Sequence, residues 1–282
     1  MSNDDLTRRD FVTLTVAGIA AAAATDASAQ QNVTEKTVEI KTPDGTCDAA
    51  FIHPATGAHP AVIIWPDAFG LRPSMRNMAR RLAGESGYSV LVPNPYYRIG
   101  KAPMWDDASK VDFGAVRDKL NPMMGSINAA GTVEKDAPAF IAWLDQQPQV
   151  DRTKKVGTQG YCMGGALVMR TAAAVPDRVG AGASFHGGGL ATKNPNSPHL
   201  LAPQIKARMY IAIAINDDKT QPDAKTILKS AFDAAKVPSE VEVYDMAQHG
   251  WCVPDMPNNL YSKADAERAW AKLLALYKAA LA

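Results

Sequence analysis

The sequence predicts an α/β fold in which helices cover both faces of a mostly parallel central sheet. Short apolar runs bounded by proline or glycine alternate along the chain with longer segments whose apolar residues recur at helical spacing. One of the short runs, PAVIIWP at residues 60–66, is apolar almost throughout, as in strands that are buried on both faces. Strands that are regularly separated by helices favour a parallel sheet with helices on each side.

The elements begin with a hairpin and continue as alternating strands and helices. Residues 38–42 and 47–54 flank the turn sequence Pro-Asp-Gly-Thr and predict two antiparallel strands. Further strands are predicted at residues 60–66, 88–95, 154–161, 179–187, 207–215 and 240–246. Helices are predicted at residues 74–87, 134–147, 164–175, 222–236 and 264–281. Residues 96–131 show neither the apolar spacing of a helix nor that of a strand. We therefore expect an irregular stretch there, which is a candidate lid over the functional site.

The first 29 residues have the order of a secretory signal. A polar start is followed by an apolar run at residues 11–24 and by Ala-Ser-Ala at residues 27–29, a typical cleavage site. The apolar run is shorter than the about 20 residues of a transmembrane helix. The sequence TRRDF resembles the twin-arginine consensus, which implies export by the twin-arginine machinery to a bacterial periplasm. An ordinary secretory signal and an amphipathic N-terminal anchor are the alternatives.

Removal of a signal peptide at residues 1–29 would leave a flexible tail at 30–36 and a single domain at 37–282. The chain has 30 basic and 29 acidic side chains, a net charge of +1, without a long run of either sign. This balance indicates neither a nucleic-acid partner nor a stable membrane anchor. No two histidines fall at the spacing of metal ligands, so we expect no metal site. We also expect a monomer without a cofactor.

Three cysteines, Cys47, Cys162 and Cys252, leave at least one thiol unpaired. Unpaired thiols are unusual in an oxidising compartment, and a retained one suggests a chemical role. Cys162 lies in QGYCMGG, between a predicted strand and a predicted helix. The spacing Gly160, Cys162, Gly164 is that of a nucleophile elbow, with sulfur in place of a serine oxygen. A buried structural thiol in a glycine-rich turn is the alternative.

Two further residue types follow later strands, at the edge where the carboxyl ends of parallel strands meet. Asp217 and Asp218 follow the strand at 207–215, and His249 follows the strand at 240–246. The order nucleophile, acid, base is that of the α/β-hydrolase fold. An imidazole accepts the proton of a thiol, and a carboxylate on its other nitrogen fixes the tautomer. We therefore predict a Cys-His-Asp triad.

Such a triad needs backbone N–H donors for the oxyanion that develops on the substrate. The residue after the nucleophile, Met163, offers one at the start of a predicted helix, where the helix dipole helps. We expect the second from the loop WPDAFGL after the first central strand, at the N–H of Ala68.

These segments together resemble the dienelactone hydrolase family. VGTQGYCMGGA, INDDKTQP and YDMAQHGW are similar to its nucleophile, acid and base segments. PAVIIWPDAFGL resembles its Glu-x-Phe-Gly-Leu loop, and VPNPYYRIG resembles its strand-to-arginine turn. The resemblance spans residues 37–282. It implies hydrolysis of a carboxylic ester or enol-lactone through an acyl-thioester, without metal or cofactor.

The resemblance also assigns individual residues. The family's spacing to a following proline selects Asp218 rather than Asp217 as the acid. Asp67 stands where the family has a glutamate that contacts the resting thiol, and Arg98 matches an arginine that binds the substrate's carboxylate. Dienelactone-specific members have a second arginine where this chain has Val253, which favours a smaller or neutral ester.

Other interpretations remain open from the sequence. His186 ends a predicted strand at the same rim, either as a pocket residue that binds substrate or modulates the thiol, or as a core histidine. A thiol redox protein that pairs Cys162 with Cys252 would not need His249. A binding module that has lost catalysis is the third class, disfavoured because every triad position is filled.

Overall fold

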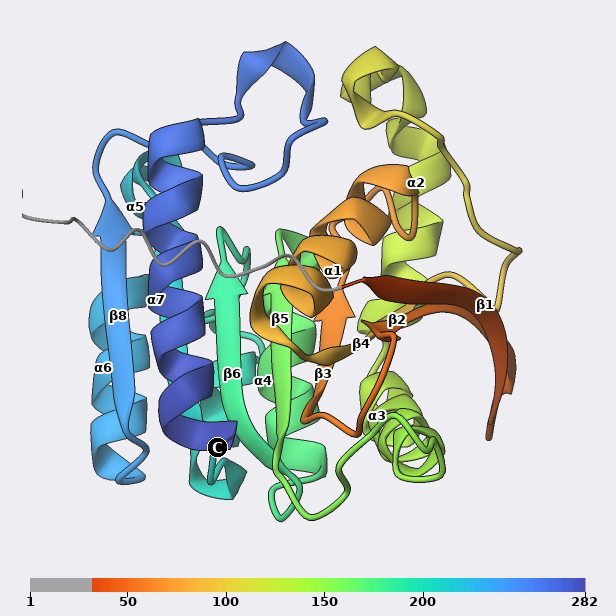
Figure 1. Ribbon diagram of the computed structural model, residues 1–282. Coiled ribbons are helices and arrows are strands. Elements are labelled where there is room, and N and C mark those ends of the chain that lie inside the picture. The colour runs from red at the N-terminus through yellow and green to blue at the C-terminus, as the bar shows by residue number, and fades with distance from the viewer. Residues whose placement is uncertain (1–31, 282) are drawn as a thin grey trace, which may run out of the picture.

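An eight-stranded sheet lies at the centre of the computed structural model, which describes residues 32–281 (Figure 1). The strands are β1 (Val33–Thr42), β2 (Gly45–Pro54), β3 (Ala61–Trp65), β4 (Ser89–Pro93), β5 (Val156–Tyr161), β6 (Val179–Phe185), β7 (Arg208–Ala214) and β8 (Ser239–Tyr244). Their order is β1-β2-β4-β3-β5-β6-β7-β8. The pairs β1–β2 and β2–β4 are antiparallel, and the remaining pairs are parallel. The predicted mostly parallel sheet is confirmed.

Helices cover both faces of this sheet. The α-helices are α1 (Pro73–Ser86), α2 (Phe113–Asn128), α3 (Thr132–Leu144), α4 (Met163–Ala174), α5 (Ile215–Thr220), α6 (Ala224–Ala234) and α7 (Lys263–Leu281). Short 3-10 helices are η1 (Ala108–Lys110), η2 (Pro198–Gln204) and η3 (Pro257–Asn259). The apolar faces of α1 and α7 belong to one core cluster, and those of α3, α4 and α6 belong to the other. Within residues 32–281, no helix is long and apolar enough to cross a membrane.

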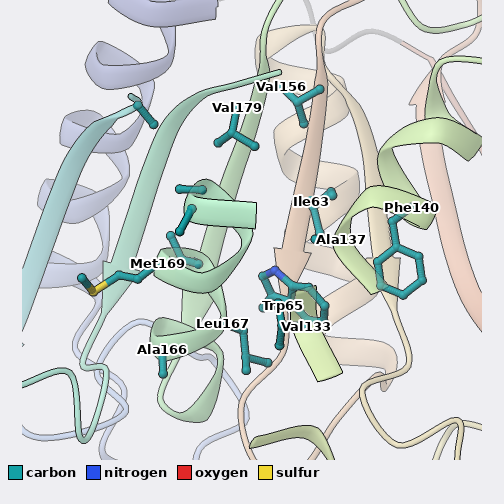
Figure 2. Close-up of a cluster of buried hydrophobic side chains, with 14 of the residues drawn as sticks. Ile63, Trp65, Val133, Ala137, Phe140, Val156, Ala166, Leu167, Met169 and Val179 are labelled. Carbon is teal, nitrogen blue, oxygen red and sulfur yellow. The ribbon is translucent and has the colours of Figure 1, made fainter. Parts of the chain in front are cut away.

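Strand β3 shows how the chain fills both cores. Ile63 and Trp65 point into the cluster beneath α3 and α4, which Figure 2 shows, whereas Val62 and Ile64 point to the opposite face. Successive side chains of a strand point to opposite faces, so a strand between two helical layers must be apolar throughout. The indole N–H of Trp65 donates to Thr171 Oγ1 at 2.9 Å, which satisfies its one polar group.

The domain begins earlier than the sequence indicates. Residues 33–36, assigned to a flexible tail, belong to β1 and pair with β2 from Val33 opposite Pro54. Glu35 also accepts a hydrogen bond from Arg76 of α1 at 2.7 Å. This edge strand contains many polar residues, so its hydropathy pattern does not indicate that its backbone pairs with β2. The predicted signal peptide at 1–29 lies outside the described residues.

The stretch 96–131 is not irregular throughout, as the sequence suggests. It contains η1 and the sixteen-residue helix α2, which stands above the carboxyl edge of the sheet in Figure 1. The Asp112 carboxylate caps α2 by accepting from the N–H of Gly114 at 2.8 Å. Pro122 lies inside the helix, although proline lacks the N–H of a regular helical hydrogen bond.

Candidate active site

The backbone turns sharply between β5 and α4 at Cys162. This residue has φ 52° and ψ −115°, although residues other than glycine rarely adopt positive φ. Its side chain is half-buried and lies at the carboxyl edge of the sheet. The predicted elbow geometry is therefore present, with the thiol at the tip of a strained turn.

The two glycines of the elbow let the helix approach the sheet. A Cβ at Gly160 would overlap the carbonyl oxygen of Gly164, and a Cβ at Gly164 would overlap the carbonyl oxygen of Trp65 in β3. Backbone atoms of β3, β5 and α4 therefore meet at distances that only glycine permits. This close contact fixes Cys162 relative to the loop that follows β3.

His249 lies in the loop after β8 and is held at both its backbone and its ring. Its N–H donates to Asn216 Oδ1 at 2.8 Å, and its Nδ1 lies 2.8 Å from Asp217 Oδ2. The thiol of Cys162 is near enough to the imidazole to contribute to raising its pKa. The three groups Cys162, His249 and Asp217 thus form one continuous chain of contacts.

Asp217, and not Asp218, is the carboxylate beside His249. The Asp218 oxygens instead accept from Lys225 Nζ at 2.7 and 2.8 Å. Residues 215–220 form the helix α5, in which adjacent side chains are rotated by about 100° around the axis. The two side chains therefore point in different directions, and the structure places Asp217 beside His249 rather than Asp218, which the spacing to the following proline had favoured.

The pKa of His249 is raised from its ordinary value of 6.5 to about 10. Burial alone would lower the pKa, but hydrogen bonds and charge interactions with Asp217 and Cys162 outweigh it. The contacts with Asp217 and Cys162 therefore favour the charged form of the imidazole.

The two expected N–H donors lie on either side of the elbow. Met163 is the first residue of α4, where an N–H has no acceptor within the helix. Ala68 lies in the turn that follows β3, and its N–H donates to no other described residue. Tyr96 contacts both of these residues. Its hydroxyl donates to the Ala68 carbonyl at 2.7 Å and lies 3.4 Å from Met163 Sδ. No sequence motif indicated a role for this tyrosine.

Asp67 is held by an arginine that sequence reasoning missed. Both its oxygens accept from Arg72, at 2.7 and 2.9 Å, and one also accepts from the Phe69 N–H at 2.9 Å. Arg72 makes two further hydrogen bonds of 2.7 Å to Asp255, and it is fully buried. Among the described residues, Asp67 makes no hydrogen bond to Cys162, so the expected contact with the thiol is replaced by this ion pair.

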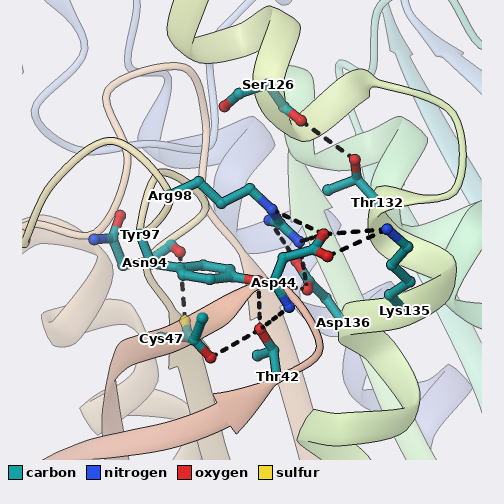
Figure 3. A network of polar contacts seen from close by, with 11 residues as sticks. Thr42, Asp44, Cys47, Asn94, Tyr97, Arg98, Ser126, Thr132, Lys135 and Asp136 are labelled. Carbon is teal, nitrogen blue, oxygen red and sulfur yellow. Dashed lines mark hydrogen bonds and ion pairs between the residues drawn. The ribbon is translucent and has the colours of Figure 1, made fainter.

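Arg98 is likewise engaged within the protein. Figure 3 shows its guanidinium between Asp44, in the turn between β1 and β2, and Asp136 of α3. Its two hydrogen bonds to Asp136 are 2.9 and 2.7 Å long, and its two to Asp44 are 3.3 and 2.9 Å long. The structure thus does not present Arg98 as a free partner for a substrate's carboxylate.

His186 lies behind the elbow. Its Nδ1 accepts from the Cys162 N–H at 3.1 Å, and its ring centre lies 4.9 Å from that of His249. Burial, and then the charge of His249, hold the pKa of His186 well below its ordinary value. The ring is fully buried, which agrees with the core interpretation and not with a pocket wall. Cys47, Cys162 and Cys252 are all free thiols, and Cys47 and Cys252 are buried.

No group of three or more His, Cys, Asp and Glu side chains within residues 32–281 is placed to hold a metal ion. The arrangement around Cys162 supplies instead a cysteine sulfur, an imidazole, a carboxylate and two backbone donors. These groups suit nucleophilic attack on a carbonyl carbon.

The elbow glycines generate a stability prediction. Gly160→Ala should lower the free energy of unfolding by about 1–3 kcal/mol, because its Cβ would force β5 and α4 apart. Gly188→Ala is the matched control, since a Cβ there meets no atom within 4 Å. Urea denaturation of both variants measures the difference. Equal stabilities would show that the contact at the elbow is not tight.

The raised pKa generates a pH prediction. The pKa of His249 in the folded protein exceeds its ordinary value of 6.5. The charged imidazole therefore contributes fully to the free energy of unfolding below about pH 6.5, and this contribution is lost as the pH rises through about 10. The imidazole proton resonances of His249 should titrate near pH 10. In Cys162→Ala the midpoint should fall, because the interaction with the sulfur is lost. A midpoint that is the same in both proteins would contradict the contact between His249 and Cys162.

Comparison with known proteins identifies the family. The model of the dienelactone hydrolase family matches residues 47–281. The carboxymethylenebutenolidase of Rhodococcus opacus is 27% identical, over 83% of this chain and 87% of its own length. A putative carboxymethylenebutenolidase of Synechocystis is 26% identical, over 80% of this chain and 89% of its own.

Solved structures show the same fold. A putative dienelactone hydrolase from Klebsiella pneumoniae superposes with a TM-score of 0.74 at 21% identity, covering 88% of this chain and 99% of that one. The dienelactone hydrolase-like promiscuous phosphotriesterase P91, from metagenomic libraries, has a TM-score of 0.71 at 23% identity, covering 89% and 99%. With an α/β-hydrolase fold and a family match over nearly all its described residues, this chain belongs to the dienelactone hydrolase family.

Proposed function

We propose that this hydrolase cleaves a neutral carboxylic ester or lactone with Cys162 as nucleophile, His249 as base and acid, and Asp217 as the orienting carboxylate. One observation carries the proposal: His249 Nδ1 lies 2.8 Å from Asp217 Oδ2, and the same imidazole interacts with the thiol at the tip of the elbow, which helps to raise its pKa. The carboxylate holds the imidazole orientation and stabilises its charged form.

The reaction begins with the proton of Cys162 on His249. The thiolate sulfur attacks the carbonyl carbon, and the oxygen of the tetrahedral intermediate accepts hydrogen bonds from the N–H groups of Ala68 and Met163. The carbon–oxygen bond then breaks, and His249 protonates the departing alcohol or enol oxygen. An acyl-thioester remains on Cys162. His249 next takes a proton from water, which attacks the thioester carbonyl, and the acid leaves as sulfur recovers its negative charge.

The charges around the site support a neutral substrate. Arg72 lies between two carboxylates, those of Asp67 and Asp255, and Arg98 lies between those of Asp44 and Asp136. When the carboxylates are ionised, the arrangement at Arg72 carries one negative charge in excess, whereas Lys135 Nζ also lies 3.2 Å from Asp44 Oδ1 and balances the charge around Arg98. Val253 is fully buried and apolar. A substrate carboxylate would therefore meet repulsion rather than a free guanidinium.

The redox alternative has less support. Cys252 is a buried free thiol, and burial raises its pKa well above the ordinary value, which disfavours the thiolate that disulfide exchange requires. A redox role would also not require the contact between His249 and Asp217.

The triad is tested with a short-chain nitrophenyl ester in the presence of reductant. Cys162→Ala and His249→Ala should reduce nitrophenol release by at least about 100-fold, because each removes a group that takes part in bond making. Asp217→Asn should also impair turnover, whereas Asp218→Asn, its matched control, should remain within about threefold of the parent. A large loss in Asp218→Asn with none in Asp217→Asn would contradict the assignment of the acid.

Substrate charge is tested with two nitrophenyl esters of similar size, the butyrate and the anionic hemisuccinate. The neutral ester should have the higher kcat/KM by about tenfold or more, because Arg72 and Arg98 are both paired with carboxylates within the protein. Raising the salt concentration should lower the ratio of the two kcat/KM values, because salt screens the repulsion between the hemisuccinate and the carboxylates of the site. A preference for the hemisuccinate would contradict the neutral substrate while leaving the triad intact.

A further inference from the structure

The turn at Asp67–Gly70 is held at each peptide that flanks Ala68. The Asp67 carbonyl accepts from the Gly70 N–H at 2.9 Å, and the Phe69 N–H donates to Asp67 Oδ1 at 2.9 Å. In a planar trans peptide the C=O and N–H point in opposite directions. Fixing the Asp67 carbonyl therefore fixes the direction of the Ala68 N–H, the proposed oxyanion donor.

Tyr96 completes this arrangement from the other side. Its hydroxyl donates to the Ala68 carbonyl at 2.7 Å, so the peptide between Ala68 and Phe69 is held at both ends. Its ring packs against the turn, where a Cβ at Gly70 would lie 3.2 Å from two ring carbons. Gly70 has φ +74°, so glycine suits both the backbone and the close approach of the ring.

The same hydroxyl reaches the second proposed donor. It lies 3.4 Å from Sδ of Met163, the residue whose N–H begins α4. The single hydroxyl proton belongs to the shorter contact, with the Ala68 carbonyl, and the sulfur packs against the oxygen. Tyr96 is fully buried, and burial, followed by the nearby charges of Asp67 and Cys162, raises its pKa. The hydroxyl thus remains a donor throughout the working pH range.

We propose that Tyr96 is a positioning residue that sets the separation and direction of the two oxyanion donors, Ala68 and Met163. This inference rests on the proposed ester hydrolysis at Cys162. Tyr96 bridges the β3–α1 turn and the first residue of α4 through its hydroxyl. Donors held in place before the reaction stabilise the oxyanion without a reorganisation cost.

Tyr96→Phe tests the proposal because it removes one oxygen and keeps the ring. Tyr97→Phe is the matched control, since that neighbouring hydroxyl bonds Thr42 and Asp136 and not the turn. Two reactions of the same thiol are compared: turnover of a nitrophenyl ester, which builds an oxyanion, and alkylation of Cys162 by iodoacetamide, which does not. Thermal denaturation of both variants monitors folding.

The expected result for Tyr96→Phe is a fall in kcat of about tenfold or more, with KM within about twofold and an unchanged alkylation rate. Tyr97→Phe should match the parent in kcat, in KM and in the alkylation rate. An unchanged kcat would overturn the proposal. An alkylation rate that falls in proportion to kcat would also overturn it, because the thiol itself would then be disturbed. Full ester turnover in Cys162→Ala would instead refute the proposed function, independently of Tyr96.

Discussion

The backbone contact between β5 and α4 determines where the other functional groups must lie. Gly160 and Gly164 allow the helix to approach the strand so closely that Cys162 is forced into positive φ. This places the thiol, and with it the first residue of α4, at the carboxyl edge of the sheet. His249 and Asp217 reach that edge because parallel strands end at one edge.

Buried charge connects the loops around this elbow. Arg72 joins Asp67, beside the proposed oxyanion donor, to Asp255 in the loop after His249, and Asp255 also accepts from the Ala108 N–H at 3.2 Å. An unpaired buried arginine would be costly, so these loops stabilise one another as a set. The same pairing keeps Arg72 from binding an anionic substrate, which links the rigidity of the site to its proposed preference for neutral esters.

Much of the fold and the identity of the candidate nucleophile and base could be predicted from sequence, because they depend on local patterns. Apolar runs give buried strands, and Gly-x-Cys-x-Gly between a strand and a helix gives the elbow. The choice between Asp217 and Asp218 could not be predicted, because it depends on the short helix α5 that turns the two side chains apart. The partners of Asp67 and Arg98 were missed for a related reason. Ion pairs between distant segments leave no periodic signal in the sequence.

The proposed mechanism depends on a covalent bond to one sulfur atom. The most direct measurement is the mass of the peptide that contains Cys162, after rapid acid quenching of the protein during turnover of nitrophenyl acetate. We expect an increase by one acetyl group on Cys162, which disappears as substrate is exhausted and is absent in Cys162→Ala. Sustained ester turnover without acylation at Cys162 would contradict the thiol as nucleophile, and with it the role assigned to the elbow.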